Sequence, residues 1–258
     1  MENILSNLPT PLELVFDPIS YIVYGIYIVL MAWEALLPAR KLPKIKYWKL
    51  KGFIAFTLFF FLSSYLPLIW DTYLAKYQLF DLTILGTGWG AVVGVLVYEL
   101  GVYVWHRSMH NSNMLWKVFH QMHHSAERLD SYGAFYFSPM DMIGFTFLGS
   151  LCLVVIAGFT PEATTLIILI TTFFSIFQHS NIKTSVWVGY LIQRPEAHAI
   201  HHAKGIHAYN YSDISLFDIL FGTFKNPKGY DHETGFYDGA SSKVSDMLLF
   251  KDVSKEEN

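Results

Sequence analysis

Long apolar runs separated by polar stretches set the pattern of the first part of the chain. Residues 19–37 form a continuous apolar run, and residues 52–70 and 82–105 form two more. A bilayer's hydrocarbon core is about 30 Å thick, which a helix of about 20 residues spans. Each run therefore predicts a membrane-crossing helix.

Two shorter apolar runs follow a polar stretch. Residues 142–158 and 162–178 are marginal in length and are joined by a turn that contains Gly158 and Pro161. We predict a tight helical hairpin that dips into the membrane and returns to the same side. Residues 106–139 are too polar to span, and we expect no crossing in residues 180–258.

This pattern predicts an all-α fold, a polytopic transmembrane bundle with three long crossings, a short hairpin and a histidine-rich helical cap. We divide the chain into N-terminal transmembrane helices (1–105), a histidine-bearing region (106–225) that includes the hairpin (142–178), and a polar C-terminal tail (226–258). The alternative, a soluble protein with buried helices, is disfavoured because three runs approach or exceed 19 residues.

Composition supports the membrane assignment. Hydrophobic residues make up 53% of the chain, charged residues only 15%, and the mean hydropathy is +0.33. The net charge of −3 is too small to suggest a nucleic-acid partner. The single cysteine, Cys152, excludes an intrachain disulfide and a cysteine-rich zinc site. No basic residue precedes the first apolar run, so we expect no secretory signal peptide.

Basic residues predict the orientation of the bundle. Six of them lie close together after the first run: Arg40, Lys41, Lys44, Lys46, Lys49 and Lys51. Cytoplasmic loops carry an excess of Lys and Arg. With three crossings and a hairpin, seventeen of the eighteen Lys and Arg residues fall on one side, and Lys76 is the exception. Every histidine motif falls on that side too, so we predict a histidine cluster on the cytoplasmic face.

Ten of the eleven histidines lie between residues 106 and 207. Eight of them form the motifs HRSMH (106–110), HQMHH (120–124) and HAIHH (198–202): His106, His110, His120, His123, His124, His198, His201 and His202. Residues three and four apart share a helix face. Neutral imidazole is the commonest protein metal ligand, so these segments predict a metal site rich in nitrogen ligands.

The number of histidines limits the kind of metal site. The chain has no HExxH zinc-protease motif and no Glu-x-x-His pair of a carboxylate-bridged di-iron bundle. Imidazole alone does not choose between zinc, copper, iron and nickel. A structural zinc site is closed with four ligands, so eight or more histidines indicate two ions. A binuclear redox site at the membrane surface suits activation of dioxygen against a C–H bond of a lipid.

One carboxylate lies within this pattern. Glu99, Tyr103, His106 and His110 form a single helical stripe. A carboxylate inside a crossing is costly unless it is paired. We therefore predict that Glu99 accepts a hydrogen bond from a ligand imidazole; the alternative is a solvated residue at the helix end.

The three motifs, in this order and followed by NY and FDILFGTF, resemble the fatty acid hydroxylase / sterol desaturase superfamily of integral-membrane non-haem di-iron enzymes. The resemblance covers residues from about 85 to 225. HQMHHSAERLD and RPEAHAIHH are most similar to the alkylglycerol monooxygenase and bacterial sterol-desaturase-like branch. The resemblance implies two iron ions, O₂ as co-substrate and a separate electron-donor protein, and zinc can replace iron in purified protein.

The resemblance also assigns residues. The eight motif histidines match catalytic and metal-ligating positions, His179 in FQHSNI matches an additional histidine, and His207 is included as a ligand with a loop residue as the alternative. His232 is expected to be solvated. Ser138 stands where many members have histidine, and Ala199 where many have arginine.

A closing segment with Asn210, Tyr211, Asp218 and Gly222–Thr223 also matches the superfamily; the alternative is an ordinary helix that ends at Gly222.

The leading prediction is an oxidoreductase that hydroxylates or desaturates a lipid taken from the bilayer, such as a sterol, a fatty acyl chain or an alkyl ether lipid. The first alternative is a membrane metal-binding or transport protein, disfavoured because the histidines lie at the ends of crossings rather than at mid-membrane. The second is a metal-dependent membrane hydrolase, for which the chain offers no obvious nucleophile or paired carboxylate.

Overall fold

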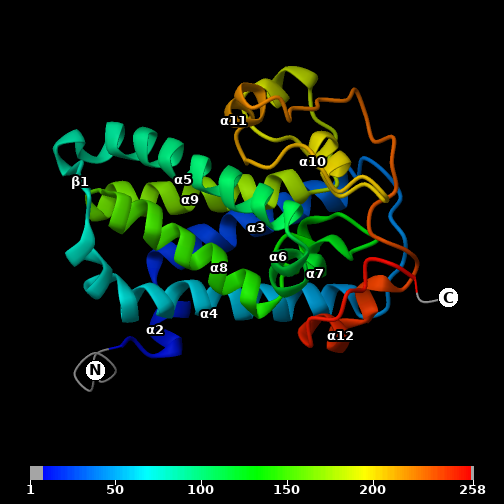
Figure 1. The fold of residues 1–258 in the computed structure, drawn as a ribbon, viewed down its shortest axis with the longest axis horizontal. Coiled ribbons are helices and arrows are strands. Elements are labelled where there is room, and N and C mark those ends of the chain that lie inside the picture. The colour runs from blue at the N-terminus through cyan, green and yellow to red at the C-terminus, as the bar shows by residue number, and fades with distance from the viewer. Residues whose placement is uncertain (1–7, 257–258) are drawn as a thin grey trace.

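Five long helices lie side by side, and the histidine-bearing segments cap one end of them (Figure 1). The computed structural model describes residues 8–256, so the first seven residues of the predicted N-terminal region and the last two of the C-terminal one lie outside it. The long helices are α3 (Pro18–Leu36), α4 (Trp48–Leu74), α5 (Gly86–Asn111), α8 (Pro139–Ser150) and α9 (Pro161–His179). This confirms the predicted all-α bundle.

Short elements connect the long helices and build the cap. In chain order they are α2 (Pro11–Val15), η1 (Ala75–Tyr77), β1 (Phe80–Asp81), η2 (Thr83–Leu85), α6 (Asn113–Leu115), η3 (Trp116–His120), α7 (Gln121–His124), η4 (Ser131–Gly133), η5 (Leu151–Ile156), β2 (Ala157–Gly158), η6 (Val186–Tyr190), α10 (Pro195–His201), α11 (Ser215–Leu220), η7 (Ala240–Ser242) and α12 (Val244–Leu248). The segments η3 and η5 are widened π-helical turns.

Three of the long helices begin with the same local signal. Asp17, Ser138 and Thr160 each accept a hydrogen bond from a backbone N–H of the first turn, and each is followed directly by proline. A capping oxygen satisfies an N–H that has no partner in the helix, and proline at the first position lacks that N–H and has a suitable φ. The sequence therefore fixes where α3, α8 and α9 start.

The hairpin runs the length of the bundle. Five segments of the described chain are long and apolar enough to cross a membrane: Pro18–Leu36, Trp48–Tyr77, Thr83–Asn111, Pro139–Ile156 and Pro161–His179. At the end away from the cap, β2 pairs in parallel with β1, the connector between α4 and α5. Both arms of the hairpin thus reach the level of that connector and are longer than the sequence pattern predicts.

Buried polar contacts tie the bundle to the cap. One oxygen of Glu34, near the end of α3, accepts hydrogen bonds from Ser131 N, Ser131 Oγ and Asn181 N. Trp48 at the start of α4 donates to Asp130 at 2.8 Å. Gly52 lies so close to the cap that a Cβ atom there would approach the carbonyl oxygen of Tyr132 to 2.1 Å. These contacts fix the cap relative to the helices that it covers.

The C-terminal segment is more than a polar tail. Phe236, Met247 and Val253 are buried against the cap. Gln121 in α7 donates to the carbonyl of Lys251 at 2.8 Å and accepts from the N–H of Val253 at 3.1 Å. Apolar residues spaced along residues 236–253 therefore bring this segment back onto the helix that bears HQMHH. His232 is exposed, as predicted.

Candidate metal centre

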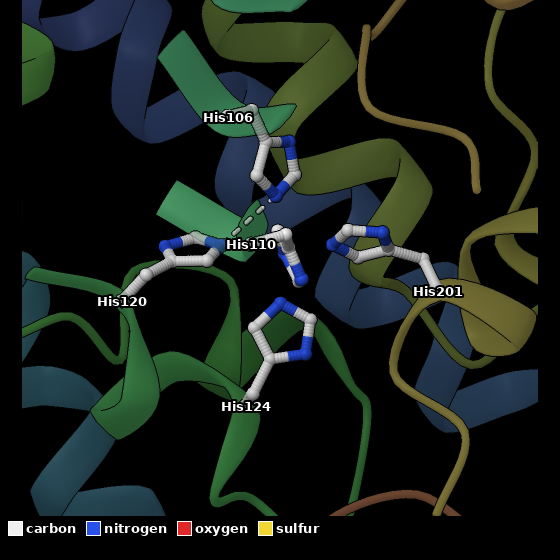
Figure 2. Close-up of side chains that lie close together, drawn as sticks. All are labelled: His106, His110, His120, His124 and His201. Carbon is white, nitrogen blue, oxygen red and sulfur yellow. Dashed lines mark hydrogen bonds between the residues drawn. The ribbon is translucent and has the colours of Figure 1, made fainter. Parts of the chain in front are cut away.

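The cap brings the motif histidines together in two groups. Within each group the potential ligand atoms all lie within 4.8 Å of one another. The five-histidine group consists of His106, His110, His120, His124 and His201, and Figure 2 shows their rings converging on one point. The four-histidine group consists of His123, His179, His198 and His202. These are nine of the ten histidines that the sequence predicts as ligands.

The two HxxHH motifs divide between the groups in opposite ways. His120 and His124 join the five-histidine group, while His123 joins the other. His198 and His202 join the four-histidine group, while His201 joins the first. In a helix, consecutive residues are rotated by about 100°, so the histidines at the fourth and fifth positions of the motif point in different directions. Each motif therefore lies between two sites and contributes to both.

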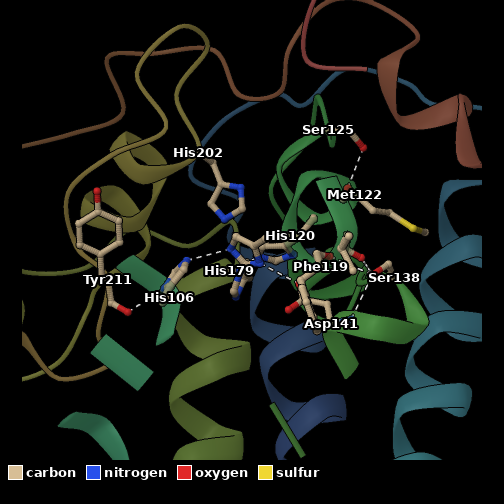
Figure 3. Close-up of polar contacts among 12 residues, drawn as sticks. His106, Phe119, His120, Met122, Ser125, Ser138, Asp141, His179, His202 and Tyr211 are labelled. Atoms are coloured by element: carbon tan, nitrogen blue, oxygen red, sulfur yellow. Dashed lines mark hydrogen bonds and ion pairs between the residues drawn. The ribbon is translucent and has the colours of Figure 1, made fainter. Parts of the chain in front are cut away.

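Backbone carbonyl groups hold three rings of the five-histidine group from behind. His106 Nδ1 donates to the carbonyl of Tyr211 at 2.7 Å, as Figure 3 shows. His110 Nδ1 donates to the carbonyl of His207 at 2.9 Å, and His201 Nδ1 to that of Tyr209 at 2.7 Å. Such bonds fix the tautomer and the orientation of a ligand imidazole. All three acceptors belong to the short segment 207–211.

The fourth ring is held by a carboxylate that the sequence analysis missed. His120 Nδ1 donates to Asp141 Oδ2 at 2.7 Å, and both side chains are buried (Figure 3). Ser138 Oγ caps the first turn of α8 by accepting from Asp141 N at 3.1 Å and donates to the carbonyl of Phe119 at 2.9 Å. An acidic residue in the first turn of an apolar helix was the available signal, but such a residue also suits the helix dipole.

The free nitrogens of this group can hold a cation. In the four rings whose Nδ1 donates to an oxygen, Nε2 carries a bare lone pair, yet His106 Nε2 and His120 Nε2 lie only 2.9 Å apart. The Nε2 atoms of His110, His124 and His201 are buried, and none has a hydrogen-bond partner within residues 8–256. Converging, unprotonated nitrogens are the donor set of a metal ion, and they fit iron, zinc, copper or nickel.

In the four-histidine group the Nε2 atoms also lie close together, but fewer of the Nδ1 atoms have hydrogen-bond partners within residues 8–256. His179 Nε2 lies 2.9 Å from His123 Nε2 and 3.0 Å from His198 Nε2, and His202 Nε2 lies 3.1 Å from His198 Nε2. His179 Nδ1 donates to the carbonyl of Ser175. The Nδ1 atoms of His198 and His202 are buried without a hydrogen-bond partner in the described chain.

The surroundings keep the cap histidines neutral. Burial and the neighbouring imidazoles lower the pKa of all six ligand histidines on the cap well below 6.5: His120, His123, His124, His198, His201 and His202. Burial disfavours the charged form of a base, and a nearby cationic ring disfavours it further. The lone pairs that a metal ion requires are thus available at neutral pH.

His207, the tenth predicted ligand, stands outside both groups. Its Nδ1 lies 3.1 Å from His124 Nδ1, so one of these rings donates to the other. Its backbone is left-handed, with φ +41°, and burial lowers the pKa of its ring to about 4. His207 thus contacts the Nδ1 atom of His124, as backbone carbonyls contact the Nδ1 atoms of His106, His110 and His201.

The prediction for Glu99 is wrong. Its carboxylate accepts from Ser212 Oγ at 3.0 Å and from the N–H of Asp213 at 2.9 Å, and it makes no hydrogen bond to an imidazole in the described residues. The carbonyl of Tyr211 occupies the place expected for it behind His106. Glu99 instead holds Ser212 and Asp213, which directly follow the Tyr211 carbonyl group that accepts from His106.

The closing segment shapes the same loop. Asp218 in α11 accepts from the N–H groups of Tyr211 and Ser212 at 2.9 and 3.0 Å. Asn210 donates to the carbonyl of Ala197 and accepts from Lys225 N. Gly222, with φ +73°, ends α11. The closing segment therefore contains both the end of α11 and the side chains that hold residues 207–211 in place.

A cavity of about 400 Å³ extends from the histidines into the bundle. His123, His179 and His198 of one group line it, as do His106 and His120 of the other. The rest of its wall comes from α3, α4, α5, α9 and the α8–η5 arm and is largely aromatic and aliphatic. Both groups thus face one apolar space that is large enough for a hydrocarbon chain.

Comparisons with known proteins point in one direction. Residues 91–223, just over half of the chain, match the fatty acid hydroxylase family. The chain is 30% identical to ornithine lipid hydroxylase OlsE of Rhizobium tropici over 53% of its own length and 42% of that protein. It is 23% identical to sphinganine C4-monooxygenase 1 of Arabidopsis thaliana, over 59% of its own length and 60% of that protein.

A third relative is very-long-chain aldehyde decarbonylase GL1-9 of Oryza sativa subsp. indica, with 26% identity over 51% of the chain and 53% of that protein. The chain thus spans about half the length of the curated relatives it matches. No solved structure matches the chain. The matched region contains all nine histidines of the two groups.

Proposed function

Because the chain belongs to the fatty acid hydroxylase family, we propose that it is a membrane-bound di-iron oxygenase that hydroxylates or desaturates the hydrocarbon chain of a lipid. One observation carries this proposal: two histidine groups border the same apolar cavity. A lipid chain in that cavity would present its C–H bonds to both sites. The superfamily predicted from the motifs is confirmed; the alkylglycerol monooxygenase-like branch stays a prediction.

The nine histidines would hold two iron ions, one in each group. Iron supplies the redox chemistry that no side chain can provide. Hydroxylation consumes O₂, two electrons and two protons and yields the alcohol and one water, so the chain needs a reductant. A separate electron-donor protein supplies these electrons in the proposal. If the histidine end is cytoplasmic, as the Lys and Arg distribution predicts, a soluble donor can reach it.

Aromatic rings line the cavity next to the histidines. The ring of Phe137 lies 4.4 Å from that of His123 and 6.4 Å from that of His120. The ring of Phe145 lies 6.3 Å from His120 and 5.8 Å from Phe137. These rings exclude water and direct a hydrocarbon chain toward the two groups, which protects a reactive site from side reactions.

The test uses the purified, iron-loaded chain in lipid nanodiscs with a chemical reductant. We expect about two iron ions per chain and, under ¹⁸O₂, either lipids that gain one labelled oxygen or lipids that lose two hydrogens. Comparison of cells with and without the gene by lipidomics then identifies the substrate. Copurified zinc leaves the proposal standing, because a commoner ion can occupy nitrogen sites.

The controls decide between this function and its rivals. Oxidation that persists in both His120→Ala and His201→Ala contradicts the proposal. Metal uptake by vesicles without oxygen consumption would identify a transporter instead. Lipid cleavage under strict anaerobiosis would identify a hydrolase.

A further inference from the structure

The cavity has a second polar end, away from the histidines. Asp71, near the end of α4, lines it together with Ser150 of the opposite helix, α8. Trp70 Nε1 donates to Ser150 Oγ at 2.7 Å. The end of the cavity away from the histidines thus carries a carboxyl group and a hydroxyl group.

One oxygen of the Asp71 carboxyl group has no hydrogen-bond partner in the described chain. Asp71 Oδ1 is buried and has no hydrogen-bond partner among residues 8–256, and none of the ion pairs in this range includes Asp71. An ionisable side chain within a membrane segment is costly and normally has a partner. A buried acceptor without a partner is unfavourable. A group that enters the cavity can supply the missing donor.

The length of the cavity follows from the helix that lines it. Phe59 of α4 lies at the histidine end, because its ring is 6.2 Å from Phe137, which contacts His123. Asp71 comes twelve residues later in the same helix. At 1.5 Å per residue the two ends are about 18 Å apart.

We propose that Asp71 binds the hydrogen-bond-donating head group of the lipid substrate, a hydroxyl, amide or ammonium group, with the hydrocarbon chain extending toward the histidines. The inference rests on the proposed function and adds the substrate class: an amphiphile oxidised about 18 Å from its head group. The opposite orientation would place a methyl end against an unpaired carboxylate oxygen, which is unfavourable.

Photolabelling tests the orientation without turnover. Two long-chain alcohols of matched length carry a diazirine, one beside the hydroxyl and one at the far end. Each is photolysed anaerobically with the full chain in nanodiscs, and labelled peptides are mapped by mass spectrometry. We expect the head-group probe to label residues 63–72 and 149–154, and the chain-end probe to label residues 120–123 and 135–145.

Several outcomes overturn the inference. These are the reverse map, equal labelling of both ends by both probes, and no labelling within the cavity. Because the experiment needs no O₂ or reductant, a reversed map in a chain that oxidises lipids removes this inference and leaves the proposed function. A chain that gives the expected map but oxidises no lipid removes the function instead.

Competition and variants identify the recognised group. Unlabelled long-chain alcohol and amine should both displace the head-group probe, whereas the methyl ether, which has no donor, should compete about tenfold less well. Stronger competition by the alcohol would indicate a neutral head group, and stronger competition by the amine a cationic one. Asp71→Leu should lower head-group labelling about tenfold, with partial recovery in Asp71→Asn.

The matched control is Glu162→Gln. Glu162 is exposed in the first turn of α9, at the same end of the bundle, and does not line the cavity. This variant should label like the unchanged chain. Equal loss in Glu162→Gln and Asp71→Leu would show a general effect of charge and would overturn the assignment to Asp71.

Discussion

The two histidine groups differ in how their rings are held. In the five-histidine group every Nδ1 has a neighbour behind it: three backbone carbonyls, the carboxylate of Asp141 and the ring of His207. In the four-histidine group, the Nδ1 atoms of His198 and His202 have no such partner in the described chain. Three of these four rings line the cavity, compared with two of the five.

This difference suggests a division of labour. Partners behind a ligand imidazole fix its orientation and raise its basicity, so the five-histidine group is the better arranged of the two to hold a metal ion tightly. In the proposed enzyme, the four-histidine group would offer fewer ligands and less restraint, and would leave more room for oxygen and substrate. The predictions below are ordered by expected effect and test this contrast.

Removal of one ligand from each group gives the largest effect. His120→Ala and His198→Ala should each lower the iron content from about two ions to about one per chain and lower lipid oxidation by more than ~100-fold, because loss of a ligand exceeds loss of its supporting partner. Elemental analysis and product quantification measure both. His232→Ala, at an exposed position, is the control and should change neither.

Asp141→Asn tests the support of a single ring. The amide keeps the size of the side chain but loses the charge that stabilises the donating imidazole of His120. We expect the metal affinity of the five-histidine group to fall about 10–100-fold, with little change at the other group. Chelator competition measures the two affinities. An equal loss at both groups would contradict the contrast between them.

Chelator treatment of the unchanged chain should release metal in two phases. The four-histidine group should lose its ion first, with an affinity lower by about tenfold. His202→Ala should remove the fast phase and His201→Ala the slow one. Release in a single phase would show that the groups hold metal equally well, and loss of the opposite phase in these variants would show that the order of affinities is reversed.

His207→Asn should have the smallest effect. Asparagine tolerates the left-handed backbone of this position, and the variant keeps the carbonyl that accepts from His110. We expect two bound ions and a decrease of only a few-fold in the affinity of the five-histidine group. Loss of one ion would instead establish His207 as a ligand rather than a loop residue, the two alternatives that the sequence leaves open.

The sequence predicts much of this molecule because its strongest signals are local. Apolar run length locates the crossings, and Ser138–Pro139 and Thr160–Pro161 mark helix starts. The spacing of HQMHH and HAIHH identifies six of the nine histidines that the structure brings together. Each hairpin arm begins before its predicted apolar run, at Pro139 rather than 142 and at Pro161 rather than 162, because the caps Ser138 and Thr160 start the helices in polar sequence.

The arrangement around the ligands could not be predicted in the same way. The division of each HxxHH motif between two sites depends on how three helices meet. The acceptors that contact His106, His110 and His201 are backbone carbonyls. Every residue has a carbonyl group, so the sequence does not show which ones act in this way. Glu99 was assigned to the wrong partner because its helical stripe shows a direction but not which loop lies there.

The segment 207–211 has a consequence for engineering. It follows the last ligand, yet its carbonyls and the ring of His207 orient four of the five rings in one group. The three histidine motifs alone, transplanted onto another helical scaffold, would carry every histidine of the five-histidine group but none of the groups that orient four of its rings. A portable version of this centre would have to include the chain as far as α11 and Thr223, which anchor that segment.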